Sequence, residues 1–267
     1  MKKVKTYLEF GYQDGDKRVP YDIRENQEAY DFFMVSRYLK DIIAYQTGKI
    51  EDVHHEFDVE DNIKKYTALS ICKNLSQPLV YYEIGSSLMG VIDSLEYFNK
   101  IFSELSVKDI LFVGVDNSDM MNTIASFLYK DYKLALFKKK TIIPCDLFFA
   151  KGVSLLYAFE DEKLFCNILK KSKLAIFDYT FSLKENSIKD IIVSGKFGTY
   201  LSLKKCKKLL VCGAKELILQ PSKRKYKIPR GRVLYECIYG NKELVKQYIE
   251  ELQKKMSHFQ HFPHLKQ

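Results

Sequence analysis

The sequence predicts an α/β fold: a seven-stranded, mostly parallel sheet with helices on both faces, preceded by a helical appendage. Short apolar runs rich in β-branched and aromatic residues alternate with segments whose apolar residues recur at helical spacing. This alternation favours parallel strands joined by helices. The last two apolar runs are joined instead by a turn-like basic link, which favours an antiparallel pair at the sheet edge.

The first 75 residues precede the predicted sheet. Residues 1–25 mix polar and aromatic residues with turn formers, so we expect an irregular lead. Apolar residues then repeat on one face over residues 28–46 and again over 61–75, and each repeat predicts a helix. We interpret residues 1–75 as a helical appendage to the core and not as an independent domain. A lid over a cleft and a dimer element are two alternative roles for it.

The centre of the chain predicts a strand, a small-residue turn, a helix, a second strand and an acid. The ranges are 79–85, 86–90, 91–105 and 109–115, followed directly by Asp116. The turn lies at a helix N-terminus, where free amides and the helix dipole favour an anionic group. An acid after the second strand lies beside that turn and can accept hydrogen bonds from both hydroxyls of a ribose. The pattern predicts a nucleoside-shaped pocket; an ordinary packing unit with a surface aspartate is the alternative.

The rest of the chain completes the sheet. Helices are predicted over 120–129, 160–171, 201–212 and 243–255, and strands over 133–137, 145–151, 174–178, 215–220 and 232–239. Residues 182–199 are ambiguous; we expect a long loop with a helix, made flexible by Gly195 and Gly198. The predicted core domain spans residues 76–256, and residues 257–267 form a flexible tail.

Composition limits the class of protein. Of 267 residues, 46% are hydrophobic, which supports a sizeable core. No run of about 18 apolar residues exists, so no membrane span is expected. The N-terminus lacks the apolar centre of a signal peptide. The six cysteines form no C-x-x-C pair, which is typical of reduced, buried thiols in a cytoplasmic protein.

The net charge of +9 is unevenly spread. Residues 1–75 carry 12 Lys/Arg and 14 Asp/Glu, whereas residues 204–232 carry 11 basic residues and one acid. This excess favours an anionic partner near the C-terminal third, such as a phosphate-bearing small molecule or nucleic acid. A solvated lysine-rich face is an equal alternative.

Residues 76–240 resemble the class I S-adenosylmethionine-dependent methyltransferases, which have a Rossmann-like fold. Four blocks in the family's order carry the resemblance: YYEIGSSLMG, LFVGVDNSDMM, CDLFFAKGVSLLYAF and the ending GAKELIL…GRVLYECIYG. The chain departs from the family's acid-x-Gly-x-Gly-x-Gly turn. Ser87 and Met89 replace the later glycines, and Gly90 comes one position late. Met89 requires the backbone to take a different path there.

The resemblance implies S-adenosylmethionine as cofactor and gives each matching residue a role. Gly85 would let the chain approach the methionine moiety, and Glu83 would hydrogen-bond near its amino group. Asp116 would hold the ribose. Asn117 and Met120 would flank the adenine, with core packing as the alternative for Met120. The implied cofactor-binding residues are Glu83, Gly85, Ser86, Ser87, Gly90, Asp116, Asn117, Ala150, Lys151 and Gly152, the last three near the methyl group.

Methyl transfer from a sulfonium is an in-line displacement, so the main contribution of the protein is alignment. A hydroxyl acceptor also benefits from a general base. The catalytic candidates near strand ends are Asp178, Lys151 and Tyr157. Asp178 ends the fifth predicted strand, at the edge where open α/β sheets bind ligands. His54 and His55 are alternative bases if the appendage covers the cleft, and surface residues otherwise.

The acceptor is expected to be small and polar. Nucleic-acid amino methyltransferases commonly carry an Asn/Asp-Pro-Pro-aromatic block after the fourth strand, where this chain has Lys-Gly-Val-Ser from Lys151. No aromatic platform for nucleic acid is apparent either. The chain is similar to sugar O-methyltransferases of bacterial surface-polysaccharide and capsule biosynthesis, and the basic link at 223–232 would suit an anionic or nucleotide-linked sugar. A homodimer is left open.

Two other function classes remain open. An NAD-dependent oxidoreductase would share the central unit and its acid, but residues 85–90 supply only the first and last glycine of G-x-G-x-x-G. A non-catalytic binding module would fit the eroded turn. No metal site is expected. His258, His261 and His264 recur every third residue, but Pro263 interrupts them and chain ends fray.

Overall fold

The computed structural model describes residues 27–53, 56–151, 162–184, 188–192, 196–200, 202–221 and 232–259. Its helices are α1 (Gln27–Thr47), η2 (Ile50–Asp52), α2 (Glu56–Cys72), α3 (Val91–Phe102), η3 (Val107–Asp109), α4 (Asp119–Leu128), α6 (Glu162–Lys171), α7 (Leu203–Leu210) and α8 (Lys242–His258). Its strands are β1 (Val80–Ile84), β2 (Leu111–Val115), β3 (Lys133–Phe137), β4 (Cys145–Ala150), β5 (Ser172–Ser182), β6 (Ile188–Ile192), β7 (Lys196–Tyr200), β8 (Lys215–Pro221) and β9 (Arg232–Asn241).

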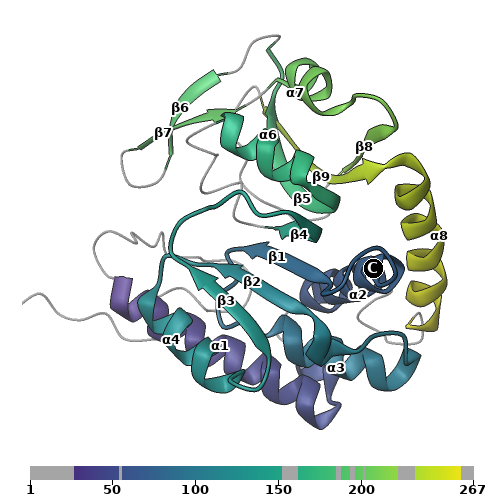
Figure 1. Ribbon diagram of the computed structural model, residues 1–267. Helices are drawn as coiled ribbons and strands as arrows, with labels where there is room; N and C mark the ends of the chain where they lie inside the picture. Colours follow the sequence, from purple (N-terminus) through teal and green to yellow (C-terminus); the bar gives the residue numbers. More distant parts are fainter. Residues whose placement is uncertain are drawn as a thin grey trace, which may run out of the picture.

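Seven of these strands form one sheet in the order β3-β2-β1-β4-β5-β9-β8 (Figure 1). The pairs β1–β2, β1–β4, β2–β3 and β4–β5 are parallel. Strand β9 is antiparallel to both of its neighbours, β5 and β8. The predicted seven-stranded α/β fold, with an antiparallel pair at one edge, is therefore confirmed. The strand order reverses beside β1, and open α/β sheets bind ligands at such a point, outside the carboxyl ends of the strands.

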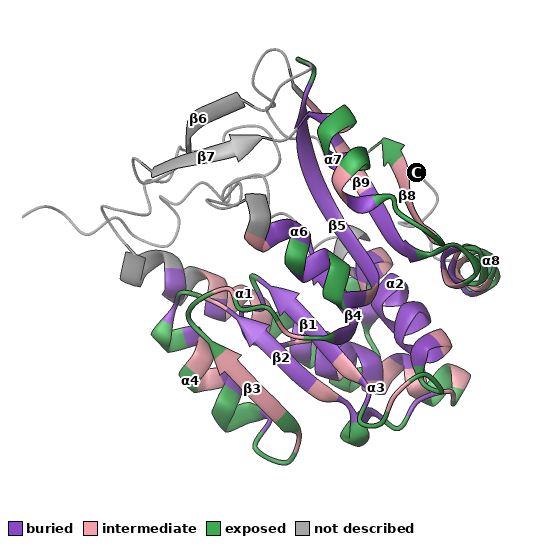
Figure 2. Cartoon of the chain, turned by 45° about the horizontal axis from the view of Figure 1, so that its top comes forward, coloured by how far each residue is buried: buried purple, intermediate pink, exposed green. Residues whose placement is uncertain are grey.

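Helices cover both faces of this sheet (Figures 1 and 2). Buried apolar residues of α1, α2, α3, α4 and α8 form one cluster with inward residues of the sheet, among them Tyr81 of β1. Residues of α6 and α7 form a second cluster on the other face, with Tyr82 of β1. Successive residues of β1 thus enter opposite clusters, as the two-residue period of a strand requires.

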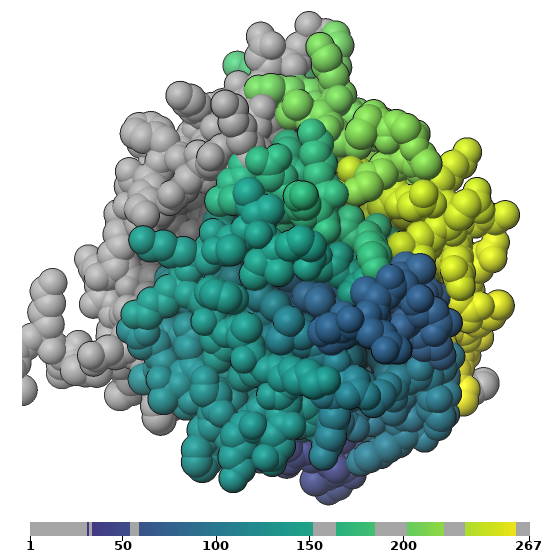
Figure 3. All heavy atoms as spheres, viewed as in Figure 1, coloured from purple at the N-terminus to yellow at the C-terminus, as the bar shows by residue number. Residues whose placement is uncertain are grey.

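The two helices that precede the sheet share its core. Tyr45 of α1 and Tyr66 of α2 are buried in the same cluster as Tyr81. Helix α2 packs against α3, α8 and β4, and α1 packs against α3 and α4. Figure 3 shows residues near the end of α2, in blue, bordering α8, in yellow, on the molecular surface. The domain boundary at residue 75 stays a prediction, and the described helices on its N-terminal side are part of the main core.

The prediction for residues 182–199 is wrong. We expected a loop with a helix there, but β6 and β7 form an antiparallel hairpin in which Gly198 pairs with Asp190. Strand β5 also runs on to Ser182, because β9 pairs with it from Leu174 to that residue. Cross-strand pairing of this length extends a strand beyond its apolar run. Helix α2 begins at Glu56, before the predicted start at residue 61.

No described helix combines the length and the hydropathy that spanning a membrane requires.

Candidate functional site

The turn after β1 approaches the end of β2 closely. Gly85 has a φ of +74°, and its N–H donates to the Val115 carbonyl oxygen over 2.8 Å. Ser87 and Met89 also adopt left-handed backbone, with φ of +48° and +56°. Residues with a Cβ pay about 1–2 kcal/mol for this conformation. The Met89 side chain is buried, and the different path expected at Met89 stays a prediction.

Asp116 lies where the sequence predicted it, at the carboxyl end of β2 and beside the turn after β1. Its Oδ2 accepts the Ser87 N–H at 3.0 Å, and its Oδ1 accepts the Ser118 N–H at 2.9 Å. Burial raises the pKa of Asp116 above its ordinary value, and repulsion from Asp31 adds to the rise, whereas the backbone N–H groups of Ser118, Ser87 and Asn117 oppose it. The carboxylate is thus fixed in orientation by the backbone of both neighbouring segments.

Glu83 points to the face of the sheet that α2 covers. Its Oε1 pairs with Lys65 Nζ at 2.9 Å, and its Oε2 accepts the Tyr81 hydroxyl at 2.6 Å. Lys65 Nζ also lies 4.3 Å from the centre of the Phe149 ring on β4. Burial and the neighbouring Glu83 raise the pKa of Tyr81 well above its usual range, so this hydroxyl keeps its proton. Both oxygens of Glu83 are therefore held in place by protein donors.

Lys151 follows β4 and lies between two acids. Its side chain is 3% exposed, and Nζ is 2.6 Å from Asp61 and 2.5 Å from Glu236. Lys64 pairs with the same Glu236 at 2.9 Å. Burial acts to lower the pKa of Lys151, but attraction to Asp61, Glu236 and Asp178 outweighs it and raises the pKa. The raised pKa favours the protonated form of Lys151 at neutral pH, so this arrangement disfavours Lys151 as a general base.

Asp178 and Glu236 lie directly opposite each other on the antiparallel strands β5 and β9. Like charges in this position repel, and Asp178 is almost fully buried. The Lys151 ammonium offsets that repulsion, because it contacts Glu236 and attracts Asp178. We name the set around it the charged edge cluster: Asp61, Lys64, Lys65, Glu83, Lys151, Asp178 and Glu236.

The structure brings only part of the predicted site together. Asp116, Gly85, Ser86, Ser87 and Gly90 meet at the turn after β1. The other described candidates come from three strands: Glu83 lies on β1, Ala150 ends β4 and is followed by Lys151, and Asp178 lies on β5. Asn117 and Met120 are exposed beside Asp116. Gly152, Tyr157, His54, His55, His261, His264 and the 223–232 link lie outside the described residues.

Sequence reasoning missed four members of the charged edge cluster. Asp61, Lys64 and Lys65 come from α2, where spacings of three and four residues place them on one helix face. Glu236 comes from β9. The helical spacing was a signal available in the sequence, but nothing there showed that this polar face meets the sheet. Within the described residues, no group of His, Cys, Asp and Glu side chains is arranged to hold a metal ion.

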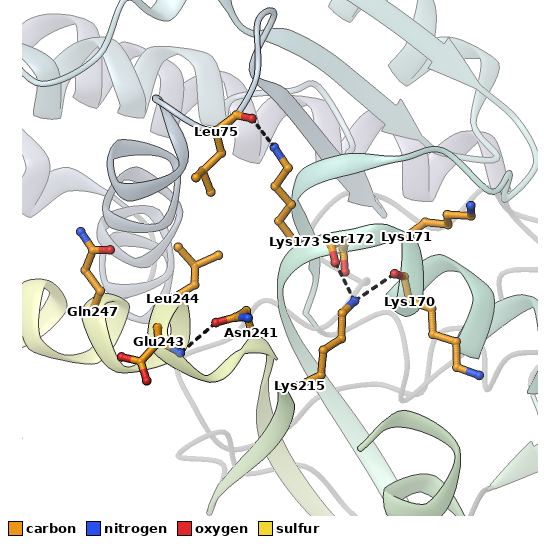
Figure 4. Close-up of a pocket in the computed structure, with 10 residues that line it drawn as sticks. All are labelled: Leu75, Lys170, Lys171, Ser172, Lys173, Lys215, Asn241, Glu243, Leu244 and Gln247. Carbon is orange, nitrogen blue, oxygen red and sulfur yellow. Dashed lines mark hydrogen bonds between the residues drawn. The ribbon is translucent and has the colours of Figure 1, made fainter. Parts of the chain in front are cut away.

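A separate cavity of about 530 Å³ lies near the amino end of β5, away from these residues (Figure 4). Lys215 Nζ donates there to the carbonyl oxygens of Lys170 and Ser172, over 2.9 and 3.3 Å. Burial lowers the pKa of Lys215, and the nearby Lys170 adds to that effect. Lys173 donates to the Leu75 carbonyl at 2.9 Å. These lysines satisfy carbonyl groups at the ends of helices and are not part of the site above.

No family model and no curated protein matches the chain. Its fold aligns with solved structures at low identity. The N-terminal domain of EvdMO1 with SAH bound is 9% identical over 71% of this chain and 83% of that chain, with a TM-score of 0.46. A S-adenosylmethionine-dependent methyltransferase from Clostridium acetobutylicum ATCC 824 is 13% identical over 68% and 91%, with a TM-score of 0.40. The plantazolicin methyltransferase BpumL in complex with SAH is 13% identical over 80% and 98%, also with a TM-score of 0.40. The fold class of this chain rests on its own sheet order and not on these likenesses.

Proposed function

We propose that the chain is a S-adenosylmethionine-dependent methyltransferase that methylates a hydroxyl of a small polar acceptor. The acceptor class we favour is a sugar or phosphate-linked sugar destined for a surface polysaccharide. One observation carries the cofactor part of the proposal: Asp116 is held at the end of β2 by the backbone of the turn after β1. That is the position from which an acid reaches the hydroxyls of a bound ribose.

The residues present fit a nucleoside. The Asp116 carboxylate has about four lone-pair sites and accepts the backbone N–H groups of Ser87, Ser118 and Asn117, which leaves room for a ribose hydroxyl. Gly85 is exposed, and its left-handed backbone carries no side chain that would block a ligand. The charged edge cluster holds four carboxylates against three ammonium groups. An excess of negative charge near the carboxyl ends of β1 and β4 suits the positive sulfonium that carries the transferable methyl group.

The charged edge cluster also suggests how the acceptor is prepared. Lys151 serves as a fixed cation that orients Glu236, since its raised pKa disfavours proton acceptance. Asp178 is the carboxylate we assign as general base, because it lies on the strand next to β4 and at the carboxyl half of the sheet. Tyr157, our third catalytic candidate, stays a prediction.

The cellular context is part of the proposal. All six cysteines are free thiols, and five of them are buried, which suits a reducing cytoplasm. We also keep a homodimer as a proposal, which light scattering of the purified protein tests directly.

A nucleic-acid acceptor is disfavoured by the sequence that follows β4, where Lys151 and Gly152 stand in place of an Asn/Asp-Pro-Pro block.

The decisive experiment is isothermal titration of the protein with S-adenosylmethionine, S-adenosylhomocysteine and NAD in parallel. We expect micromolar binding of the first two ligands and its loss in Asp116→Ala. Asp119→Ala is the matched control, because this exposed acid lies three residues away and pairs with Lys138. A preference for NAD would favour the oxidoreductase alternative, and binding of none of the three would favour a non-catalytic binding module.

The acceptor is tested separately, by mass spectrometry of nucleotide-linked sugars incubated with the protein and S-adenosylmethionine. A gain of one methyl group in the sugar supports the proposed acceptor class. Asp178→Asn is expected to lower the rate while leaving S-adenosylhomocysteine affinity unchanged, since Asp178 is assigned to the acceptor step. Equal methylation rates for the unaltered protein and Asp178→Asn would remove Asp178 from the mechanism.

A further inference from the structure

A second buried acid lies close to Asp116. Asp31 of α1 is 6% exposed, and its Oδ2 accepts the Ser118 hydroxyl at 2.6 Å. The contact joins residues 87 positions apart and ties α1 to α4, which lie side by side in Figure 1. A separation this short is typical of a hydroxyl donating to an ionised carboxylate.

Ser118 connects this acid to Asp116. Its hydroxyl donates to Asp31 and accepts the Met121 N–H at 3.2 Å, which caps the first turn of α4. Its own N–H donates to Asp116 Oδ1 at 2.9 Å. Ser118 is thus held by Asp31 through its hydroxyl and holds Asp116 through its N–H. If the contact with Asp31 is lost, the capping turn that holds Asp116 loses a support.

The two carboxylates also interact through their charge. Repulsion from Asp31 contributes to the raised pKa of Asp116. Asp119 of α4 and Lys138 after β3 pair with each other at 2.6 Å. The described part of α1 also carries Arg37, Lys40 and Asp41, β1 carries Glu83 and β3 carries Lys133, but Asp31 is the charge that contributes to the pKa of Asp116. The N-terminal end of α4 favours negative charge nearby, which lowers the cost of placing both acids there.

We propose that Asp31 is a positioning residue for Asp116, the ribose-binding carboxylate. Asp31 fixes Asp116 through Ser118 and sets the acidity at which the site binds its ligand. The proposal rests on the function proposed above. It gives the N-terminal helix α1 a part in cofactor binding. Asp31 does not contact the ligand in this scheme; it acts through Ser118 and through its charge.

The pH dependence follows from the signs of these interactions. Ligand binding needs ionised Asp116, so affinity is full above the pKa of Asp116 and falls as the pH drops through it. Because that pKa is raised, the loss begins at a higher pH than for an ordinary aspartate. Removing the charge of Asp31 lowers the pKa of Asp116, and the loss of affinity then moves to lower pH.

The test is titration of S-adenosylhomocysteine into the full chain, from neutral pH downward, for the unaltered protein and three variants. Asp31→Asn keeps an oxygen that can accept from Ser118 but removes the charge, whereas Asp31→Ala removes both. Asp41→Asn is the control, because it neutralises another buried acid of α1. The ligand has titrating groups of its own, but they are common to all four proteins and cancel in the comparison.

We expect Asp31→Ala to weaken binding about tenfold at neutral pH. Asp31→Asn should bind like the unaltered protein at neutral pH and retain affinity to lower pH, a shift that a purely structural role would not produce. If Asp31→Ala fails to fold, the pH profile of Asp31→Asn decides alone. Coincident profiles for Asp31→Asn, Asp41→Asn and the unaltered protein would overturn this proposal and leave the proposed function standing. No binding by the unaltered protein would overturn both.

Discussion

Replacing Gly114 with alanine tests whether close packing behind the turn after β1 shapes the site. Gly114 lies in the middle of the sheet, on β2 between Glu83 of β1 and Leu136 of β3. A Cβ added there would lie 2.6 Å from Ser86 Oγ, 2.8 Å from Leu136 Cδ2 and 2.9 Å from Met89 Sδ. Two of these three atoms belong to the turn after β1, so the added methyl group would push directly on it.

The expected loss of stability follows from these distances. Carbon atoms pack comfortably at about 3.5–4.0 Å, so all three contacts are far too short. The Leu136 and Met89 atoms are ends of flexible side chains and can retreat, which relieves part of the strain. Overpacking of this kind costs about 1–3 kcal/mol. For a chain of this size, a loss of about 2 kcal/mol lowers Tm by roughly 4–8 °C.

The assay compares urea unfolding with S-adenosylhomocysteine titration at a temperature where every variant is folded. Gly240→Ala is the matched control, because its Cβ would meet the Lys173 carbonyl oxygen at 2.7 Å, near the amino end of β5. We expect both variants to lose stability but only Gly114→Ala to lose affinity, by about tenfold. Equal affinity for the two variants, or unchanged stability of Gly114→Ala, would refute the reasoning.

Two further predictions concern buried groups. Lys151→Met removes the closer of the two cations that Asp61 and Glu236 share and leaves them only Lys64. We expect urea unfolding to show a loss of about 3–5 kcal/mol, part of which returns in the Lys151→Met/Glu236→Gln double variant. A single variant as stable as the unaltered protein would contradict the ion-pair geometry. Among the cysteines only Cys212 is exposed, and burial raises the pKa of the Cys72 thiol to about 12. A thiol reagent should therefore label the native protein quickly at Cys212 alone, and fast labelling that persists in Cys212→Ser would show that a buried thiol is accessible.

Local sequence patterns predicted the elements of the sheet well. Strand β3 spans the predicted residues 133–137, and β1, β2 and β4 differ from prediction by two residues or fewer at either end. These strands are short apolar runs bounded by turn residues, and β1, β2 and β4 are mostly buried, so their own composition identifies them. Asp116 could be predicted for the same reason, since a residue that directly follows a recognisable parallel strand must lie at the carboxyl edge of the sheet.

The hairpin of β6 and β7 could not be predicted in this way. Its strands are five residues each, they pair only with each other in the described structure, and Gly198 lies inside one of them. Glycine normally indicates a turn. The extension of β5 to Ser182 likewise depends on β9, a strand that lies far along the chain. In both cases the pairing partner, and not the segment itself, determines the conformation.

The sequence by itself determined the α/β class, the number of strands in the sheet and the position of Asp116, because apolar periodicity and turn residues act over a few neighbouring positions. Only the tertiary structure decided which charges meet. Lys64 and Glu236 are 172 positions apart, and Lys151 and Asp61 are 90 apart. Such pairs form because the strand order places β9 beside β5 and packs α2 against β4. Burial then makes each charge depend on a partner that its own sequence neighbours do not reveal.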